Sequence, residues 1–138
     1  MPNSGPSEDR ALIRELYENY ADAANRGDRE AWLDCYAADG VWKSPYFDVT
    51  GREASGRQYD QILANVVDTT FFTQIGVIHV DGDRASARAF CQESLLQRDG
   101  QTYDLTGEYA DDLTRQDGAW VFQRRDYTIK REKPPGAA

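Results

Sequence analysis

Three Asp-Gly turns divide the second half of the chain into four long segments of alternating hydrophobicity. The segments are 71–80, 84–97, 102–115 and 120–129, separated by Asp81-Gly82-Asp83, Arg98-Asp99-Gly100 and Asp117-Gly118. Glycine readily adopts the positive φ angles of tight turns, so an Asp-Gly pair between alternating segments indicates a hairpin. Three successive hairpins predict a four-stranded antiparallel meander.

The first half of the chain has a helical period instead. An apolar stripe predicts a first helix that Ser7 caps and that ends near Asn25, before Gly27. We expect Asp28 to cap a second, shorter helix, followed by a strand at 41–44 and a third helix. The buried faces expected for the second and third helices are Ala31, Trp32, Cys35 and Tyr36, and Tyr59, Ile62, Leu63 and Val66. The pattern predicts an α+β fold in which three helices precede the sheet.

The length and the net charge of the chain limit the number of domains and the classes of partner that we expect. The 138 residues suit a single domain at 7–132, with a disordered lead at 1–6 and a disordered tail at 133–138. The formal net charge of −8 opposes binding to phosphate backbones and to anionic membranes. We therefore expect neither nucleic acid nor membrane as a partner.

The reactive side chains point to chemistry without a cofactor. No ligand cluster at metal spacing and no glycine-rich phosphate loop occur, so we expect no metal and no cofactor. The N-terminus has no apolar signal segment, which predicts a cytoplasmic protein with Cys35 and Cys91 reduced. The single histidine, His79, precedes the first Asp-Gly turn, and a two-residue loop there would turn it outward.

Strand parity places a group of polar side chains on the inner face of the sheet. Glu93 alternates with apolar residues on one strand, and Tyr109 and Asp111 do so on the next. A two-residue loop at Asp117-Gly118 would pair Asp111 with Arg124 and Tyr109 with Asp126. The expected polar wall of a cavity is Glu93, Tyr109, Asp111, Arg124 and Asp126.

Two interpretations of this wall remain open. A carboxyl group that loses hydration has a raised pKa, and it can then move protons at neutral pH. Alternatively, Asp111 and Arg124 form a cross-strand ion pair, with Glu93 and Asp126 near the rim of the sheet. Parity alone does not separate the two.

Four segments resemble the nuclear transport factor 2-like superfamily, and they span nearly the whole chain. They are YADAANRGD at 20–28, WLDCYAADGVW at 32–42, GREA at 51–54 and VDGDRA at 80–85. SnoaL-like polyketide cyclases, scytalone dehydratase relatives and ketosteroid isomerases are the branches it resembles. The resemblance implies a cone-shaped, cystatin-like α+β domain with a pocket for a small molecule between helices and a curved antiparallel sheet.

The resemblance also implies roles for single residues. Tyr20 stands where the isomerases place a tyrosine that donates a hydrogen bond to a carbonyl oxygen, and Asp111 stands where these enzymes keep a pocket acid. The isomerase base position holds Ser44, and the dehydratase-like histidine is absent from 71–74. Asp126 lies in a segment similar to the end of limonene epoxide hydrolase, where an Asp activates water.

The resulting hypothesis is a cofactor-independent lyase, isomerase or cyclase acting on a small, mostly apolar cyclic carbonyl compound. Its catalytic residues would be Asp111, Tyr20, Asp126 and Arg124. Its substrate-binding residues would be Trp42, Ser44, Tyr46, Glu93 and Tyr109. An epoxide hydrolase-like enzyme with Asp126 and Glu93 around a water, and a non-catalytic binding or dimerisation module, are the alternatives. We also expect a homodimer, from the family and from Phe90, Leu96, Tyr103 and Val121 on the outer face of the sheet.

Overall fold

Four long strands form the antiparallel meander that the Asp-Gly turns predict. In a computed structural model, which describes residues 2–136, they are β3 (Val66–Asp81), β4 (Arg84–Gln97), β5 (Thr102–Gln116) and β6 (Ala119–Lys133). Asp117 and Gly118 have φ angles of 51° and 81°. These positive angles match the right-handed twist of a two-residue hairpin.

Two shorter strands extend this meander into a six-stranded sheet of order β2-β1-β6-β5-β4-β3. Strand β1 (Tyr36–Ser44) runs parallel to β6 and antiparallel to β2 (Phe47–Thr50). We expected Cys35 and Tyr36 in the second helix, and this was wrong. The Phe122 amide donates to the Cys35 carbonyl (2.8 Å), so the chain leaves the helix early to pair with β6.

Three helices precede the meander, as the sequence predicts. They are α1 (Ser7–Arg26), α2 (Arg29–Asp34) and α3 (Arg52–Leu63). Gly27 ends α1 with a φ of 65°, and the Asp28 side chain caps α2 by accepting from the Ala31 amide. Ser7 is not a cap, because it is already the first helical residue, and Val66 belongs to β3. None of the helices within residues 2–136 is long and apolar enough to cross a membrane.

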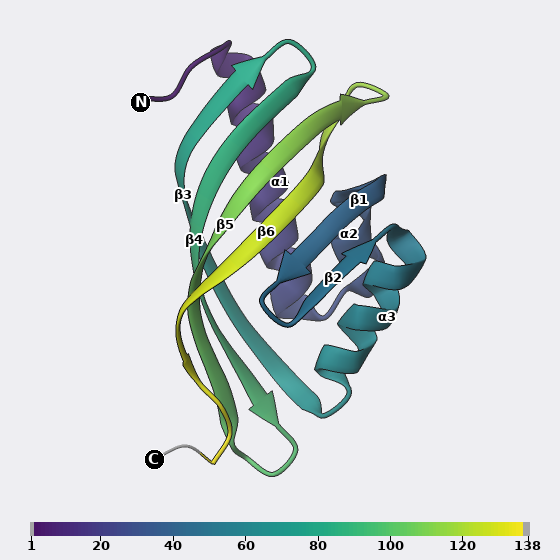
Figure 1. Cartoon of the computed structure of the whole chain (residues 1–138), viewed down its shortest axis with the longest axis vertical. Coiled ribbons are helices and arrows are strands. Elements are labelled where there is room, and N and C mark those ends of the chain that lie inside the picture. The colour runs from purple at the N-terminus through teal and green to yellow at the C-terminus, as the bar shows by residue number, and fades with distance from the viewer. Residues whose placement is uncertain (1, 137–138) are drawn as a thin grey trace.

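The core lies between the concave face of the sheet and α1. Figure 1 shows β3 to β6 curving around α1, with β1, β2, α2 and α3 gathered beside β6. Ile13, Tyr17 and Tyr20 of α1 are buried against this face, together with Ile78 and Phe122. The α+β architecture of helices packed on a curved sheet is confirmed.

The N-terminal lead contacts the edge of the sheet, in contrast to the disordered segment expected at 1–6. The Ser4 amide donates to the Ile78 carbonyl (3.0 Å), and the Val80 amide donates to the Ser4 carbonyl (3.1 Å). The Asn3 side chain accepts from the Ile78 amide (2.8 Å), and the Ser4 hydroxyl lies 3.0 Å from His79 Nδ1. These contacts cover part of an edge strand. Met1 and residues 137–138 lie outside the described residues.

We predict that deleting residues 2–5 lowers the melting temperature by roughly 3–8 °C, because three backbone-directed hydrogen bonds to β3 are lost. Differential scanning calorimetry of the deletion and of a variant lacking 134–138 tests this. The second truncation begins after the last residue of β6, Lys133, and should leave the melting temperature nearly unchanged. An equal effect of the two truncations would contradict the role given to the lead.

Candidate functional site

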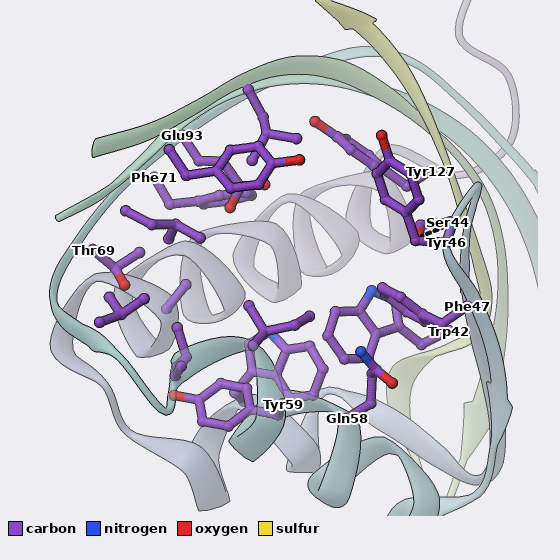
Figure 2. A pocket seen from close by; sticks show the side chains of 18 of the residues that line it. Trp42, Ser44, Tyr46, Phe47, Gln58, Tyr59, Thr69, Phe71, Glu93 and Tyr127 are labelled. Atoms are coloured by element: carbon purple, nitrogen blue, oxygen red, sulfur yellow. Dashed lines mark hydrogen bonds between the residues drawn. The ribbon is translucent and has the colours of Figure 1, made fainter. Parts of the chain in front are cut away.

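A cavity of about 320 Å³ lies between the sheet and the helices at the end of the molecule that holds α3. Its wall combines residues of α1, α2, the β1–β2 hairpin, α3 and all four long strands. Aromatic side chains make up nearly half of this lining. Figure 2 shows Glu93 and Phe71 on the sheet side, facing Tyr59 and Gln58 of α3 across the open space. A predominantly apolar cavity with few polar groups is typical of a small-molecule site.

Six of the residues predicted from the sequence line this cavity. They are Tyr20, Trp42, Ser44, Tyr46, Glu93 and Tyr109. Asp111, Arg124 and Asp126 do not line it. His79 lies beside the N-terminal lead and away from the cavity. Within residues 2–136, no group of three or more His, Cys, Asp or Glu is arranged to hold a metal ion.

Among the described residues that line the cavity, Glu93 is the only carboxylic acid. It lies on β4 between Phe71 of β3 and Leu105 of β5, two apolar neighbours that also line the cavity. No hydrogen bond or ion pair to its carboxylate is formed within the described part of the chain. Burial without a compensating partner raises the pKa of Glu93 from 4.5 to about 7. This side chain can therefore both accept and release a proton near neutral pH.

Tyr20 and Tyr109 are two of the tyrosines that line this cavity. Tyr20 comes from the inner face of α1, and Tyr109 from β5, one inward position from the site of Asp111. Burial raises the pKa of both hydroxyls, although the nearby Arg125 cation opposes this shift. Both groups stay protonated at neutral pH, so each can donate a hydrogen bond to a ligand oxygen.

The predicted inward positions of Arg124 and Asp126 were wrong, because β6 contains an extra residue. Leu113 pairs with Phe122 as expected, but Asp112 pairs with Arg124, so Gln123 forms a bulge. One extra residue exchanges the two faces of a strand. Arg125 and Tyr127 therefore point inward, and Arg124 and Asp126 form a partly exposed ion pair (3.7 Å).

Asp111 is buried behind the cavity wall in an ion pair with Arg125. The exposed fractions of these two residues are 2% and 1%. Arg125 Nε donates to Asp111 Oδ1 (2.8 Å), Nη2 donates to Oδ2 (3.0 Å), and the Tyr17 hydroxyl also donates to Oδ2. Burial alone would lower the pKa of the Arg125 guanidinium, but Asp111, Tyr20 and Tyr17 together more than offset this and raise it.

The guanidinium of Arg125 is also surrounded by aromatic rings. Its central carbon lies 3.7 Å from the ring centre of Tyr109, 4.3 Å from Phe122 and 4.5 Å from Tyr20. These ring faces stabilise a buried cation. Both carboxylate oxygens of Asp111 accept hydrogen bonds. Asp111 is therefore part of an ion pair, as in the second interpretation of the sequence, but its partner is Arg125 instead of Arg124.

The sequence matches the profile of the SnoaL-like domain over residues 6–126, which is most of the chain. The chain belongs to the SnoaL-like domain family. A comparison with curated proteins gave no match.

Solved structures share the fold of this SnoaL-like domain. A candidate aromatic ring hydroxylase from Novosphingobium aromaticivorans has a TM-score of 0.88 and 23% identity, covering 95% of this chain and 96% of its own. A candidate scytalone dehydratase from the same organism has a TM-score of 0.84 and 20% identity, covering 94% and 89%. Hexachlorocyclohexane dehydrochlorinase LinA-type3 from Novosphingobium barchaimii has a TM-score of 0.80 and 15% identity, covering 95% and 92%.

Sequence reasoning missed two inward residues of this SnoaL-like domain, Arg125 and Tyr127. One signal for Tyr127 was present in the sequence, because Gly107 interrupts an otherwise regular strand. A Cβ atom at Gly107 would lie 2.3 Å from the Tyr127 ring, so the glycine makes room for that ring. The bulge at Gln123 has no comparable signal in the sequence.

We predict that Asp111→Asn lowers the free energy of unfolding by about 3–5 kcal/mol, because it leaves a buried guanidinium without its counter-charge. Urea denaturation at pH 7 measures this change. Asp112→Asn is the matched control, since Asp112 is the neighbouring residue on the exposed face of β5. If both variants lose the same small amount, the Asp111–Arg125 pair is not a major source of stability.

Proposed function

We propose that this SnoaL-like domain catalyses a cofactor-independent proton transfer on a small, mostly apolar cyclic carbonyl compound. Isomerisation, dehydration and cyclisation all include such a step. Glu93 is the acid/base in place of Asp111, and Tyr20 donates a hydrogen bond to the carbonyl oxygen. One observation carries the proposal: an unpaired carboxylic acid with a pKa of about 7 faces an apolar cavity.

The arrangement of the three polar groups supports this chemistry. The Glu93 carboxylate accepts a proton from the carbon next to the carbonyl group, and negative charge develops on the carbonyl oxygen. The Tyr20 and Tyr109 hydroxyls, already in place, stabilise this charge by hydrogen bonds. The protonated Glu93 then returns the proton to another atom of the substrate, which completes an isomerisation or assists loss of a hydroxyl group.

The shape of the cavity and the names of the relatives support a cyclic substrate. Trp42 packs edge-on against Phe47, with ring centres 4.6 Å apart, and against Trp32 at 4.7 Å. All three rings line the cavity, and such a wall suits a flat ring. Two of the structural relatives are named for reactions on cyclic compounds, scytalone dehydration and hexachlorocyclohexane dehydrochlorination. The epoxide hydrolase alternative loses its second acid, because Asp126 does not line the cavity.

Hydrogen–deuterium exchange tests the proton transfer without knowledge of the full reaction. A panel of cyclic ketones is incubated with the protein in D₂O, and loss of the signals of the hydrogens next to the carbonyl group is followed by NMR. We predict that Glu93→Gln slows this exchange about a hundredfold or more. Tyr20→Phe should slow it as well, because a donor to the developing oxyanion is lost.

The pH dependence provides a second signature of Glu93. Exchange by the wild-type protein should rise with pH and level off above about pH 7, because the carboxylate is the active form. The raised pKa also makes the wild-type fold less stable as pH rises from about 4.5 to about 7, since the unfolded carboxyl group ionises earlier. Glu93→Gln should therefore melt higher than wild type at pH 8, which excludes unfolding as the cause of lost exchange. Equal exchange by both proteins would refute Glu93 as the base, and exchange no faster than in buffer would favour a ligand-binding module.

A homodimer formed through the outer face of the sheet is the second part of the proposal. Phe72 and Phe90 lie on adjacent strands of this face, with 67% and 38% of their surfaces exposed. Val121 also lies on this face, and Leu96 is partly buried. Tyr103, which we expected there, instead lines the cavity. Exposed apolar side chains gathered on a sheet favour an interface.

Sedimentation equilibrium tests the dimer. We predict a dimer at micromolar concentration for wild type and a monomer for the double variant Phe72→Asp, Phe90→Asp, because a charge on each side would lose hydration at the interface. Leu12→Asp is the control, since Leu12 is an exposed apolar residue of α1, away from this face. A wild-type monomer would refute the interface.

A further inference from the structure

A second bulge on β6 determines which charge lies at the mouth of the cavity. Gly107 pairs with Ile129 and Thr106 pairs with Arg131, so Lys130 is an extra residue on β6. The bulge exchanges the two faces of the strand beyond Ile129. Glu132 consequently pairs with Leu105, whose side chain lines the cavity.

The basic neighbours of Glu132 are directed to the other face. Arg131 pairs with Thr106, which is on the outer face of β5. Lys130 lies over the ring of the outward-facing Phe90, with its nitrogen 4.9 Å from the ring centre. Without the bulge, Arg131 would follow Ile129 on the cavity side. Because of the extra residue, the side chain opposite Leu105 on the cavity side is a glutamate, Glu132, and not an arginine.

Two tyrosines of the cavity wall hold the Glu132 carboxylate. The hydroxyl of Tyr46, in the turn between β1 and β2, donates to Oε1, and the hydroxyl of Tyr103 on β5 donates to Oε2. Both tyrosines line the cavity, and Tyr46 and Glu132 are exposed to solvent; we call this solvent-exposed part of the cavity wall its mouth. The hydrogen bonds from Tyr103 and Tyr46 lower the pKa of Glu132, which keeps it ionised at neutral pH.

The rest of the cavity offers no competing positive charge. Within residues 2–136, no Lys, Arg or His lines the cavity and no cation forms an ion pair with Glu132. Beside the carboxylate are the rings of Tyr46 and Tyr103, and Trp42 and Phe47 also belong to the β1–β2 hairpin. Aromatic faces next to a carboxylate are the surroundings in which proteins bind organic cations.

We propose that the mouth of the cavity is a cation-binding site, and that the cyclic substrate carries a protonated amine or quaternary ammonium group held by Glu132, Tyr46 and Tyr103. The ring of the substrate then occupies the cavity, with its carbonyl group toward Glu93 and Tyr20. Only the placement of the substrate ring in this inference rests on the proposed function; the cation site does not. Glu132 selects the charge of the substrate, and Glu93 transfers the proton.

A matched set of ligands tests this division of roles. The tert-butyl and trimethylammonium groups have nearly the same shape, so 4-tert-butylcyclohexanone and 4-(trimethylammonio)cyclohexanone differ mainly in charge. The 4-carboxylate of cyclohexanone supplies the opposite charge. Dissociation constants are measured at low salt from the fluorescence of Trp32 and Trp42, which line the cavity. At pH 6, Glu93 is mostly protonated and contributes little to the comparison.

We expect the ammonium compound to bind wild type about five- to tenfold more tightly than the tert-butyl compound, and the carboxylate to bind most weakly. The preference should shrink in high salt, because the site is exposed to solvent. Glu132→Gln should reduce the ratio to about one while leaving affinity for the tert-butyl compound unchanged. Glu18→Gln, an exposed acid on α1, is the control and should retain the preference.

Failure of this inference differs from failure of the proposed function. Equal binding of the two isosteres by wild type, or a preference that survives Glu132→Gln, would refute the cation site even if Glu93→Gln abolishes exchange. A preference that disappears in Glu132→Gln supports the cation site whether or not exchange occurs. Absence of binding by the whole set would overturn both.

Discussion

The buried ion pair between Asp111 and Arg125 is the interaction on which the arrangement of the other elements depends. It joins β5 to β6, and the Tyr17 hydroxyl extends it to α1. Removing two charges from water is costly, so the pair is tolerated only with several hydrogen bonds and the ring faces around the guanidinium. Any register that separates the two residues would leave a charge unpaired in the core. The pair therefore selects one register between β5 and β6.

That register requires β6 to bulge, and the bulges decide what faces the cavity. Between Phe122 and Arg125 the inward positions are three residues apart, so Gln123 interrupts the alternation. Tyr127 then points inward into the space that Gly107 leaves. The later bulge at Lys130 brings Glu132 to the cavity side. The chemistry of the wall and of the mouth thus follows from irregularities in one strand.

Where the strands are regular, the sequence was sufficient to predict which side chains lie on the inner face of the sheet. Strands β4 and β5 pair without a shift, so strand parity placed Glu93, Tyr109 and Asp111 on the inner face correctly. Parity failed on β6 at Gln123, because a bulge depends on tertiary contacts that the alternation of residue types does not record. The prediction that Cys35 is helical failed for a similar reason, because a hydrogen bond from the amide of the distant Phe122 ends the helical segment. Local patterns determine the elements, whereas contacts distant in sequence determine their ends and faces.

Asp111 and Glu93 are both acids on the inner face of the sheet, but their surroundings differ, and this contrast supports the proposal that Glu93 rather than Asp111 transfers the proton. Asp111 accepts hydrogen bonds at both carboxylate oxygens, has a permanent cation beside it and does not line the cavity. Glu93 has no partner among the described residues, and its charge is disfavoured by the apolar wall. A fold gains nothing in stability from an unpaired acid that is partly buried against apolar neighbours, as Glu93 is. The same sheet shows how an acid is neutralised at Asp111, so the lack of a partner at Glu93 supports the proposed role of Glu93 in proton transfer.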